Sequence, residues 1–184
     1  NWTWEREALD LFAKHNETGE ALPDELYSRL IEARQFVGGW AQMRQLALGT
    51  IDLELHEQMA RKLRGDAEGQ KVGDELNAVQ GSEVMEFARS RFTDFAPEPE
   101  FAAFHILTSF THIFAGGYAA GYYSYLWSEV LDADVFTRFR DEGIFNRETG
   151  RLYVDSILSR GDSDDPDALF LEFMGRAPNP AALL

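Results

Sequence analysis

The chain has 184 residues, of which 45% are hydrophobic and 13% aromatic, so its composition excludes a disordered segment and is sufficient for a real core. A formal net charge of −15 argues against nucleic acid and anionic membrane surfaces as partners, because phosphate groups are bound by clustered Lys and Arg. The absence of cysteine excludes disulfides and thiolate chemistry; it fits a reducing cytoplasm, although a cysteine-free periplasmic protein would have the same composition.

The chain opens inside an amphipathic segment, NWTWEREALD, that lacks an initiating Met and the apolar stretch of a signal peptide. We therefore expect Asn1 to be a cut edge and the chain to be a piece of something larger. Trp2 and Trp4 would then need cover, and an apolar surface left bare around them would allow self-association. No apolar run approaches the ~20 residues that span a bilayer, so no membrane segment is predicted.

Two helices are predicted next, over 23–37 and 39–63, because apolar residues recur at helical spacing in both. Residues 64–84 are polar and glycine-bearing, which predicts a surface loop with a weak helix. Two prolines in 95–103 predict an extended or turning segment. The apolar faces comprise Leu26, Leu30, Ala33 and Val37 in the first helix, and Trp40, Met43, Ala47, Ile51, Leu55 and Met59 in the second.

Helix boundaries are also predicted in the last third of the chain. Gly143 is expected to end a segment, Asn146 to cap a helix over 147–160, and Asp165-Pro166 to start a helix over 167–174. No stretch alternates with period two for long enough to predict a sheet. We therefore predict an all-α fold, with residues 1–184 forming a single multi-helix domain.

Motifs of several enzyme classes are missing from the sequence. The helical zinc-protease motif H-E-x-x-H needs a second His four residues after the first, but Ala60 stands there after His56-Glu57. We predict that His56 is an ordinary residue on a helix face. Neither the nucleophile elbow G-x-S-x-G nor the phosphate loop G-x-x-x-x-G-K-[ST] occurs.

The most unusual stretch is FTHIFAGGYAAGYYSYLWSEV at 110–130. If a helix begins near Tyr118, then Tyr118, Tyr122 and Tyr125 fall at i, i+4 and i+7 and present three hydroxyls on one face. His112 lies just before two glycines that free the backbone to take unusual dihedrals or to move. Such donors would suit stabilisation of an oxyanion. An aromatic core helix with close helix contacts explains the same spacing, so spacing alone leaves both interpretations open.

This stretch closely resembles a signature of the zinc oligopeptidases of the thimet oligopeptidase, oligopeptidase A and peptidyl-dipeptidase family. The match is ungapped and unusual in composition, and it resembles the bacterial oligopeptidase A type in particular. The resemblance covers nearly the whole chain, least clearly at 64–95. It is also carried by NWTWEREALDLFAKHNETGEALPDEL (1–26), RQLALGTIDLELH (44–56), DEGIFNRETG (141–150), SILSRGDSDDP (156–166) and FMGRAPNPAALL (173–184).

The resemblance also implies what the chain lacks. In this family two zinc ligands come from H-E-x-x-H and a third from a Glu shortly before an Asn-Trp or His-Trp pair, and Asn1-Trp2 would be that pair. All three ligands and the catalytic Glu would therefore lie upstream. The chain would form roughly the final quarter of a larger zincin-type peptidase. Zinc is thus the implied cofactor of the complete enzyme, with no metal ligand among this chain's own residues.

The resemblance assigns roles to residues of the signature. His112 matches a loop histidine that hydrogen-bonds the substrate near the scissile bond. Tyr125 matches the tyrosine that stabilises the oxyanion, and Tyr118 one that contacts the substrate or transition state. Tyr122 matches a tyrosine that lines the cleft, and Gly116 and Gly117 match a flexible glycine loop. The predicted catalytic residues are therefore His112, Tyr118 and Tyr125, and the predicted substrate-binding residues are Tyr122, Gly116 and Gly117.

These observations predict the C-terminal portion of a zinc metallo-oligopeptidase that hydrolyses short peptides and is inactive alone. Its expected partners are short peptide substrates and an upstream metal-binding portion, with no nucleic acid and no membrane, in the cytoplasm. The alternative is a non-catalytic helical module, derived from the same fold, that binds peptides or another partner. Endopeptidases and dipeptide-releasing enzymes share the signature, so it does not distinguish between them.

Overall fold

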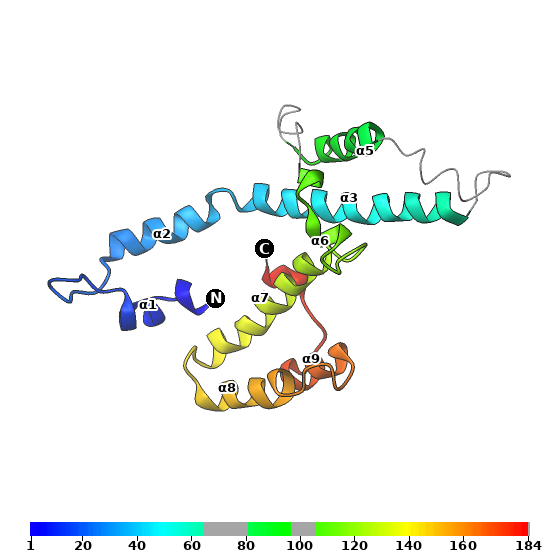
Figure 1. Ribbon diagram of the computed structural model, residues 1–184. Helices are drawn as coiled ribbons and strands as arrows, with labels where there is room; N and C mark the ends of the chain where they lie inside the picture. Colours follow the sequence, from blue (N-terminus) through cyan, green and yellow to red (C-terminus); the bar gives the residue numbers. More distant parts are fainter. Residues whose placement is uncertain (65–80, 97–105, 184) are drawn as a thin grey trace. The chain divides into compact units, whose positions relative to one another are not determined.

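A computed structural model describes residues 1–64, 81–96 and 106–183 of the chain (Figure 1). Within these ranges the regular structure is helical, and the one extended pairing is an isolated antiparallel bridge between Lys14 and Ala21. The predicted all-α fold is confirmed. None of the described helices has the length and apolar character needed to cross a membrane. The α-helices are α1 (Arg6–Phe12), α2 (Asp24–Phe36), α3 (Gly38–Arg64), α5 (Gly81–Thr93), α6 (Thr111–Phe114), α7 (Ser124–Glu142), α8 (Arg147–Tyr153) and α9 (Pro166–Met174).

Short helical turns complete the regular structure. Three are 3₁₀ turns, η1 (Trp2–Trp4), η3 (Ile106–Thr108) and η5 (Pro180–Ala182), and one is a π-helical turn, η4 (Val154–Leu158), that continues directly from α8. The predictions for 64–84 and 95–103 fall largely outside the described residues.

The predicted stop at Gly143 and the predicted helix starts after Asn146 and at Asp165-Pro166 are confirmed, whereas the helix predicted over 147–160 is α8 followed by a π-helical turn that ends at Leu158. Gly143 follows the last residue of α7 and has a φ of 106°, a conformation that glycine adopts without steric cost. The side chain of Asn146 accepts hydrogen bonds from the first amides of α8, and that of Asp165 accepts one from an amide of α9. These caps satisfy N–H groups that have no partner within the helix, so short polar residues at these positions predict the boundaries well.

The chain divides into two compact units, which are described separately. The first unit combines Asn1–Phe36 with Trp127–Leu184, and the second is Val37–Leu126.

The core of the first unit is built from aromatic side chains of α7 and α9. The ring of Trp2 contacts Phe136 and Phe139 edge-on, with centroids 4.7 Å and 4.9 Å apart, and its indole N–H donates to the carbonyl oxygen of Ile144 at 2.7 Å. Trp2 therefore has the cover that it was expected to lack. The buried members of this core are Val135, Phe136, Phe139, Phe170 and Phe173.

An ion pair between the buried Asp134 and the partly exposed Arg176 links the chain after α9 to α7. The Asp134 carboxylate is fully buried and accepts two hydrogen bonds from the Arg176 guanidinium, at 2.6 Å and 2.7 Å. It also accepts the backbone N–H of Asn179 at 2.7 Å. The hydrogen bonds from Arg176 are the largest cause of a pKa for Asp134 below its ordinary value of 3.8. Three donors thus compensate the desolvation of this carboxylate.

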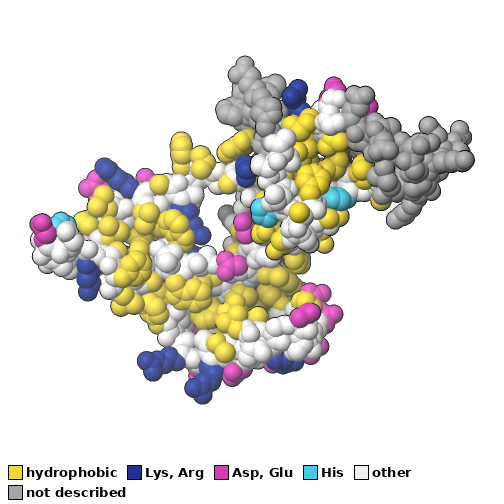
Figure 2. Space-filling view, viewed as in Figure 1, with side chains coloured by type: hydrophobic (Ala, Val, Ile, Leu, Met, Phe, Trp, Pro, Cys, Tyr) yellow, Lys and Arg dark blue, Asp and Glu magenta, His cyan; other side chains and the backbone are white. Residues whose placement is uncertain are grey.

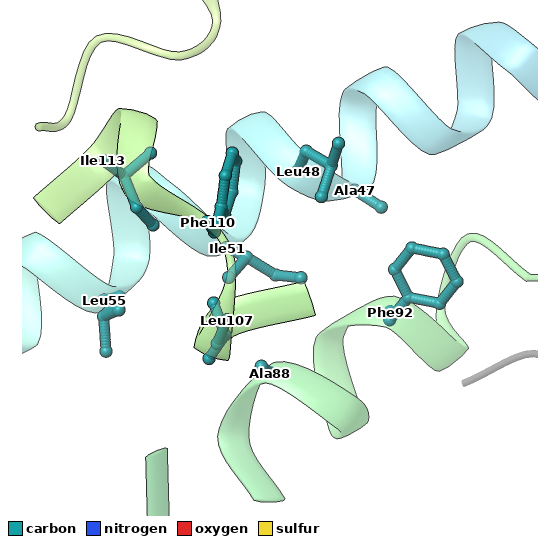
Figure 3. Packing of buried hydrophobic residues seen from close by; sticks show 9 residues of the cluster. All are labelled: Ala47, Leu48, Ile51, Leu55, Ala88, Phe92, Leu107, Phe110 and Ile113. Carbon is teal, nitrogen blue, oxygen red and sulfur yellow. The ribbon is translucent and has the colours of Figure 1, made fainter. Parts of the chain in front are cut away.

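The core of the second unit lies between α3, α5 and the segment that leads into α6 (Figure 3). Three residues of the predicted apolar face of α3 are buried there, which confirms that part of the prediction. The cluster comprises Ala47, Leu48, Ile51 and Leu55 of α3, Ala88 and Phe92 of α5, and Leu107, Phe110 and Ile113.

Apolar side chains also remain exposed (Figure 2). The helix predicted over 23–37 forms as α2, but none of its residues is fully buried; Leu30 of its predicted apolar face is partly buried and Leu26 is exposed. Trp4 is partly buried under the guanidinium of Arg34, which lies 4.7 Å from the ring centroid. Self-association stays a prediction. Large exposed apolar residues include Leu11, Phe12, Leu26, Phe36, Trp127, Phe145, Leu158 and Leu171.

Candidate functional site

A tightly hydrogen-bonded glycine turn follows α6 in the second unit. The N–H groups of Ala115 and Gly116 both donate to the carbonyl oxygen of Thr111, at 2.8 Å. The N–H of Tyr118 donates to the carbonyl oxygen of His112 at 3.0 Å. Gly117 has a φ of 83°, which suits a residue without a side chain. The turn therefore folds back on α6 and brings Tyr118 towards His112.

Gly116 lies directly against the backbone of His112. A Cβ atom placed on Gly116 would lie 2.8 Å from the Cα atom of His112 and 3.0 Å from its carbonyl oxygen. Backbone atoms cannot move aside as a flexible side-chain end can, so any larger residue must displace α6 or the turn. The sequence therefore needs glycine at this position for close approach.

Gly116→Ala is expected to lower the free energy of unfolding by about 1–3 kcal/mol, the usual cost of forcing extra atoms into a packed region. Gly121→Ala is the matched control, because its new Cβ would lie 3.5 Å from the nearest atom, an ordinary van der Waals contact. Urea unfolding followed by circular dichroism measures both variants. Equal stability of the two variants would show that the close contact at Gly116 carries no cost.

Four ring-bearing residues converge beside this turn, and we name them the His–Tyr cluster: His112, Tyr118, Tyr122 and Tyr125. The His112 ring lies at similar centroid distances from the three tyrosines, 6.2 Å, 6.1 Å and 6.2 Å in chain order. Tyr125 stacks on Tyr118 with centroids 5.2 Å apart and contacts Tyr122 at 5.0 Å. All the ring-bearing residues predicted for the site are therefore brought together.

The cluster presents hydrogen-bond donors that solvent can reach. His112, Tyr118 and Tyr125 are exposed and Tyr122 is partly buried. A hydrogen bond with Tyr118, followed by burial, raises the pKa of Tyr125 above its ordinary value of 10.0. Tyr125 therefore stays protonated at neutral and mildly alkaline pH. A protonated phenol can donate a hydrogen bond to an oxygen that becomes negative during a reaction.

The backbone that carries these tyrosines differs from the prediction. A helix beginning near Tyr118 is wrong, because α7 begins at Ser124 and residues 118–123 form consecutive turns. Ala120 within these turns has a φ of 55°, which no α-helix contains. The N–H of Gly121 donates to the carbonyl oxygen of Tyr118 at 2.8 Å. The tyrosine rings thus gather through turn geometry and not through helical spacing.

Asp52 of α3, which was not among the predicted site residues, contacts this turn. Asp52 accepts the N–H of Ala120 at 3.0 Å and the N–H of Tyr122 at 2.8 Å. A signal was present in the sequence, since a carboxylate four residues after Leu48 occupies the apolar face of a predicted helix. His56 lies on the face of α3 as predicted, and its role there includes contact with Asp52.

A metal site, by contrast, needs several ligating side chains close together. Among residues 1–64, 81–96 and 106–183, no group of three or more His, Cys, Asp or Glu side chains is placed to hold a metal ion. The described residues therefore do not fit a zinc ion, and the chemistry that they offer is hydrogen bonding to a polar ligand.

Known proteins are similar in sequence to this chain along its whole length. The family model described as peptidase family M3 matches residues 1–184. Oligopeptidase A of Escherichia coli is 44% identical over all of this chain, which covers 25% of that relative. For Oligopeptidase A of Haemophilus influenzae the values are 45% and 24%. Dipeptidyl carboxypeptidase of Escherichia coli is 32% identical, again with all of this chain and 25% of the relative covered.

The chain thus spans about a quarter of the length of the curated relatives it matches. The match to the family model includes the segment that carries the His–Tyr cluster and all the described helices. With a family model that matches the whole sequence, the chain belongs to peptidase family M3.

Proposed function

We propose that this chain is the C-terminal portion of a zinc metallo-oligopeptidase that hydrolyses peptide bonds in short peptides. Membership of a peptidase family along the whole chain supports this class of reaction. The observation that carries the role of the chain is the convergence of an imidazole and three phenols in the His–Tyr cluster. Such a set of donors is suited to a substrate rich in carbonyl oxygens, as a peptide is.

The proposed reaction develops charge on the substrate. When water attacks the carbonyl carbon of the scissile bond, the carbonyl oxygen becomes an oxyanion. Tyr125 donates its hydroxyl hydrogen bond to that oxyanion, and Tyr118 contacts the same region of the transition state. His112 donates an imidazole N–H to a backbone carbonyl of the substrate next to the scissile bond. Tyr122, Gly116 and Gly117 line the path of the bound peptide.

The zinc ion would be held by a preceding portion of the enzyme, because the described residues do not fit it. It follows that the isolated chain is expected to be inactive. The proposed partners are short peptides and that preceding portion, and the cysteine-free composition supports a cytoplasmic location.

A chimaeric peptidase tests this function. In it, the present chain replaces the matching C-terminal quarter of Escherichia coli Oligopeptidase A, to which it is 44% identical. With zinc present, we expect the chimaera to cleave a quenched fluorescent peptide. We expect no cleavage by the isolated chain or by the Escherichia coli protein truncated before that quarter, since each holds only part of the site.

The controls separate failure of folding from failure of the proposal. Circular dichroism and size-exclusion chromatography establish whether the chimaera is folded. A folded chimaera that binds zinc and peptide but does not cleave would overturn the proposed catalytic function. It would instead favour the non-catalytic peptide-binding module. Cleavage by the isolated chain, after rigorous removal of contaminating peptidase, would overturn the assignment of the metal to another portion.

A further inference from the structure

Asp52 is a carboxylate in the middle of an apolar core. It has no exposed surface, and its neighbours along α3 include the buried side chains of Leu48, Ile51 and Leu55. Burial of a carboxylate is costly unless hydrogen bonds replace its lost hydration. A buried carboxylate at such a position therefore needs specific hydrogen-bond donors, and the residues that donate identify the segment that the carboxylate holds in place.

The hydrogen-bond donors to the carboxylate lie in the turn before α7, and His56 contacts the carboxylate from the next turn of α3. Oδ1 of Asp52 accepts the N–H of Ala120 at 3.0 Å and Oδ2 accepts the N–H of Tyr122 at 2.8 Å. Nδ1 of His56 lies 2.9 Å from Oδ1 and also 2.9 Å from the backbone carbonyl oxygen of Asp52. Because both of these oxygens are acceptors, Nδ1 of His56 carries a hydrogen. His56 thereby orients the carboxylate from within α3.

The two backbone donors lie in a segment that has no helix or strand ladder to hold it. Ala120 has a φ of 55°, in the left-handed region, which is unfavourable for a residue with a Cβ. The carboxylate offsets the unfavourable energy of this conformation, because it accepts hydrogen bonds from the N–H groups of the residues on both sides of Gly121. Hydrogen bonds to an ionised acceptor are about twice as strong as neutral ones.

The held segment is the one that places the cluster rings. Tyr122 bonds Asp52 through its own N–H, and its ring contacts Phe110 at 4.9 Å and Tyr125 at 5.0 Å between centroids. Tyr118 lies two residues before Ala120 and stacks on Tyr125. A shift of the turn would therefore separate the rings of the His–Tyr cluster.

We propose that Asp52 is a positioning residue for the peptidase reaction: oriented by His56, it holds the turn 118–123 so that the tyrosine hydroxyls converge on the substrate. The inference rests on the proposed function of the His–Tyr cluster. It goes beyond that function by assigning a role to two residues of α3 whose contacts are with the turn and not with the substrate. A misplacement of about 1 Å at a reacting group can lower a rate about 10²-fold.

Asp52→Asn in the chimaeric peptidase tests this role. Asparagine has nearly the same shape but only one acceptor oxygen, so one backbone N–H would face an amide group that is itself a donor. We expect kcat to fall ~10–10²-fold with KM changed less than about threefold, because the tyrosines are misplaced for the transition state while most peptide contacts remain. Gly49→Ala is the matched control on α3, since its Cβ would lie 3.5 Å from the Cα of Tyr123, an ordinary contact. Its kcat is expected to be unchanged.

A double-variant cycle with Tyr125→Phe distinguishes positioning from a general structural role. If Asp52 acts through the tyrosines, Asp52→Asn should lower kcat much less when the Tyr125 hydroxyl is already absent. Multiplication of the two single effects would overturn the inference. Unchanged kcat for Asp52→Asn, with Tyr125→Phe impaired, would overturn it while the proposed function stands. Full activity of Tyr125→Phe would instead contradict the proposed function itself.

His56→Phe gives a second, milder perturbation. It removes the imidazole contact with the Asp52 carboxylate and leaves both backbone hydrogen bonds from the turn, so it keeps the inference testable if Asp52→Asn does not fold. We expect a smaller fall in kcat than for Asp52→Asn, again reduced when combined with Tyr125→Phe. Unchanged kcat for a folded His56→Phe, together with a non-folding Asp52→Asn, would overturn the role assigned to the pair.

Discussion

Replacement of Tyr125 by phenylalanine in the chimaeric peptidase is expected to lower kcat by ~10²–10³-fold, the typical effect of removing one oxyanion donor. KM should change little, because the hydrogen bond strengthens only as charge develops on the carbonyl oxygen. The ring itself is retained, so its contacts with Tyr118 and Tyr122 remain. Steady-state kinetics with a quenched peptide measures both constants.

Tyr123→Phe is the matched control for this experiment. Tyr123 is two residues away, is 55% exposed and is outside the His–Tyr cluster. Its kcat should therefore stay within a factor of about two of the parent, as expected for a surface change. A fall in kcat of the same size in both variants would show that any tyrosine in this segment matters, and that the Tyr125 hydroxyl has no particular role. Unchanged kcat for Tyr125→Phe would contradict the oxyanion role directly.

The second large effect is expected at the Asp134–Arg176 ion pair of the first unit, in which the carboxylate is buried and the guanidinium is partly exposed. Arg176→Ala is expected to lower the free energy of unfolding at pH 7 by about 3 kcal/mol, because it leaves the Asp134 carboxylate buried without its cation. The N–H of Asn179 remains as a donor, which keeps the loss from being larger. Arg29→Ala is the control, since the Arg29–Glu25 pair is exposed and should contribute less than about 1 kcal/mol.

The loss of stability in Arg176→Ala should depend on pH. In the parent chain the pKa of Asp134 is lowered in the folded state, so its contribution is complete above the ordinary value of 3.8 and is lost as pH falls through the lower folded pKa. Without Arg176 the main cause of the lowering is gone. As the pH falls, the buried Asp134 carboxylate of the variant is therefore protonated, and loses its charge, at a higher pH than in the parent. Urea unfolding should therefore show the difference between the two proteins shrinking below about pH 4. A constant difference from pH 7 to pH 3 would exclude Asp134 as the titrating group.

Local sequence signals predicted much of this protein correctly. The caps Asn146 and Asp165 and the terminating Gly143 lie at helix boundaries because the groups involved are neighbours in sequence. The long apolar period of α3 predicted a helix whose middle is buried. The same period in α2 predicted a helix that forms, although none of its residues is buried. Periodicity therefore predicts the helix but not what covers it.

The start of α7 shows where local signals were insufficient. The residues between Tyr118 and Tyr123 have a spacing that a helix would satisfy, yet the chain forms turns there. The reason is tertiary, since Asp52 lies 68 and 70 residues away in sequence from the two amides that it accepts. The left-handed conformation of Ala120 is incompatible with a helix at that point.

The sequence by itself therefore determined the all-α class, most helix boundaries and the identity of the four residues of the His–Tyr cluster. Helical propensity, capping and turn formation depend on neighbouring residues, which a single sequence displays. Only the tertiary structure decided how the cluster is held, because a buried carboxylate on α3 competes for amides that would otherwise join a helix. The segment FTHIFAGGYAAGYYSYLWSEV encodes the donors, and Asp52 determines the backbone that brings them together.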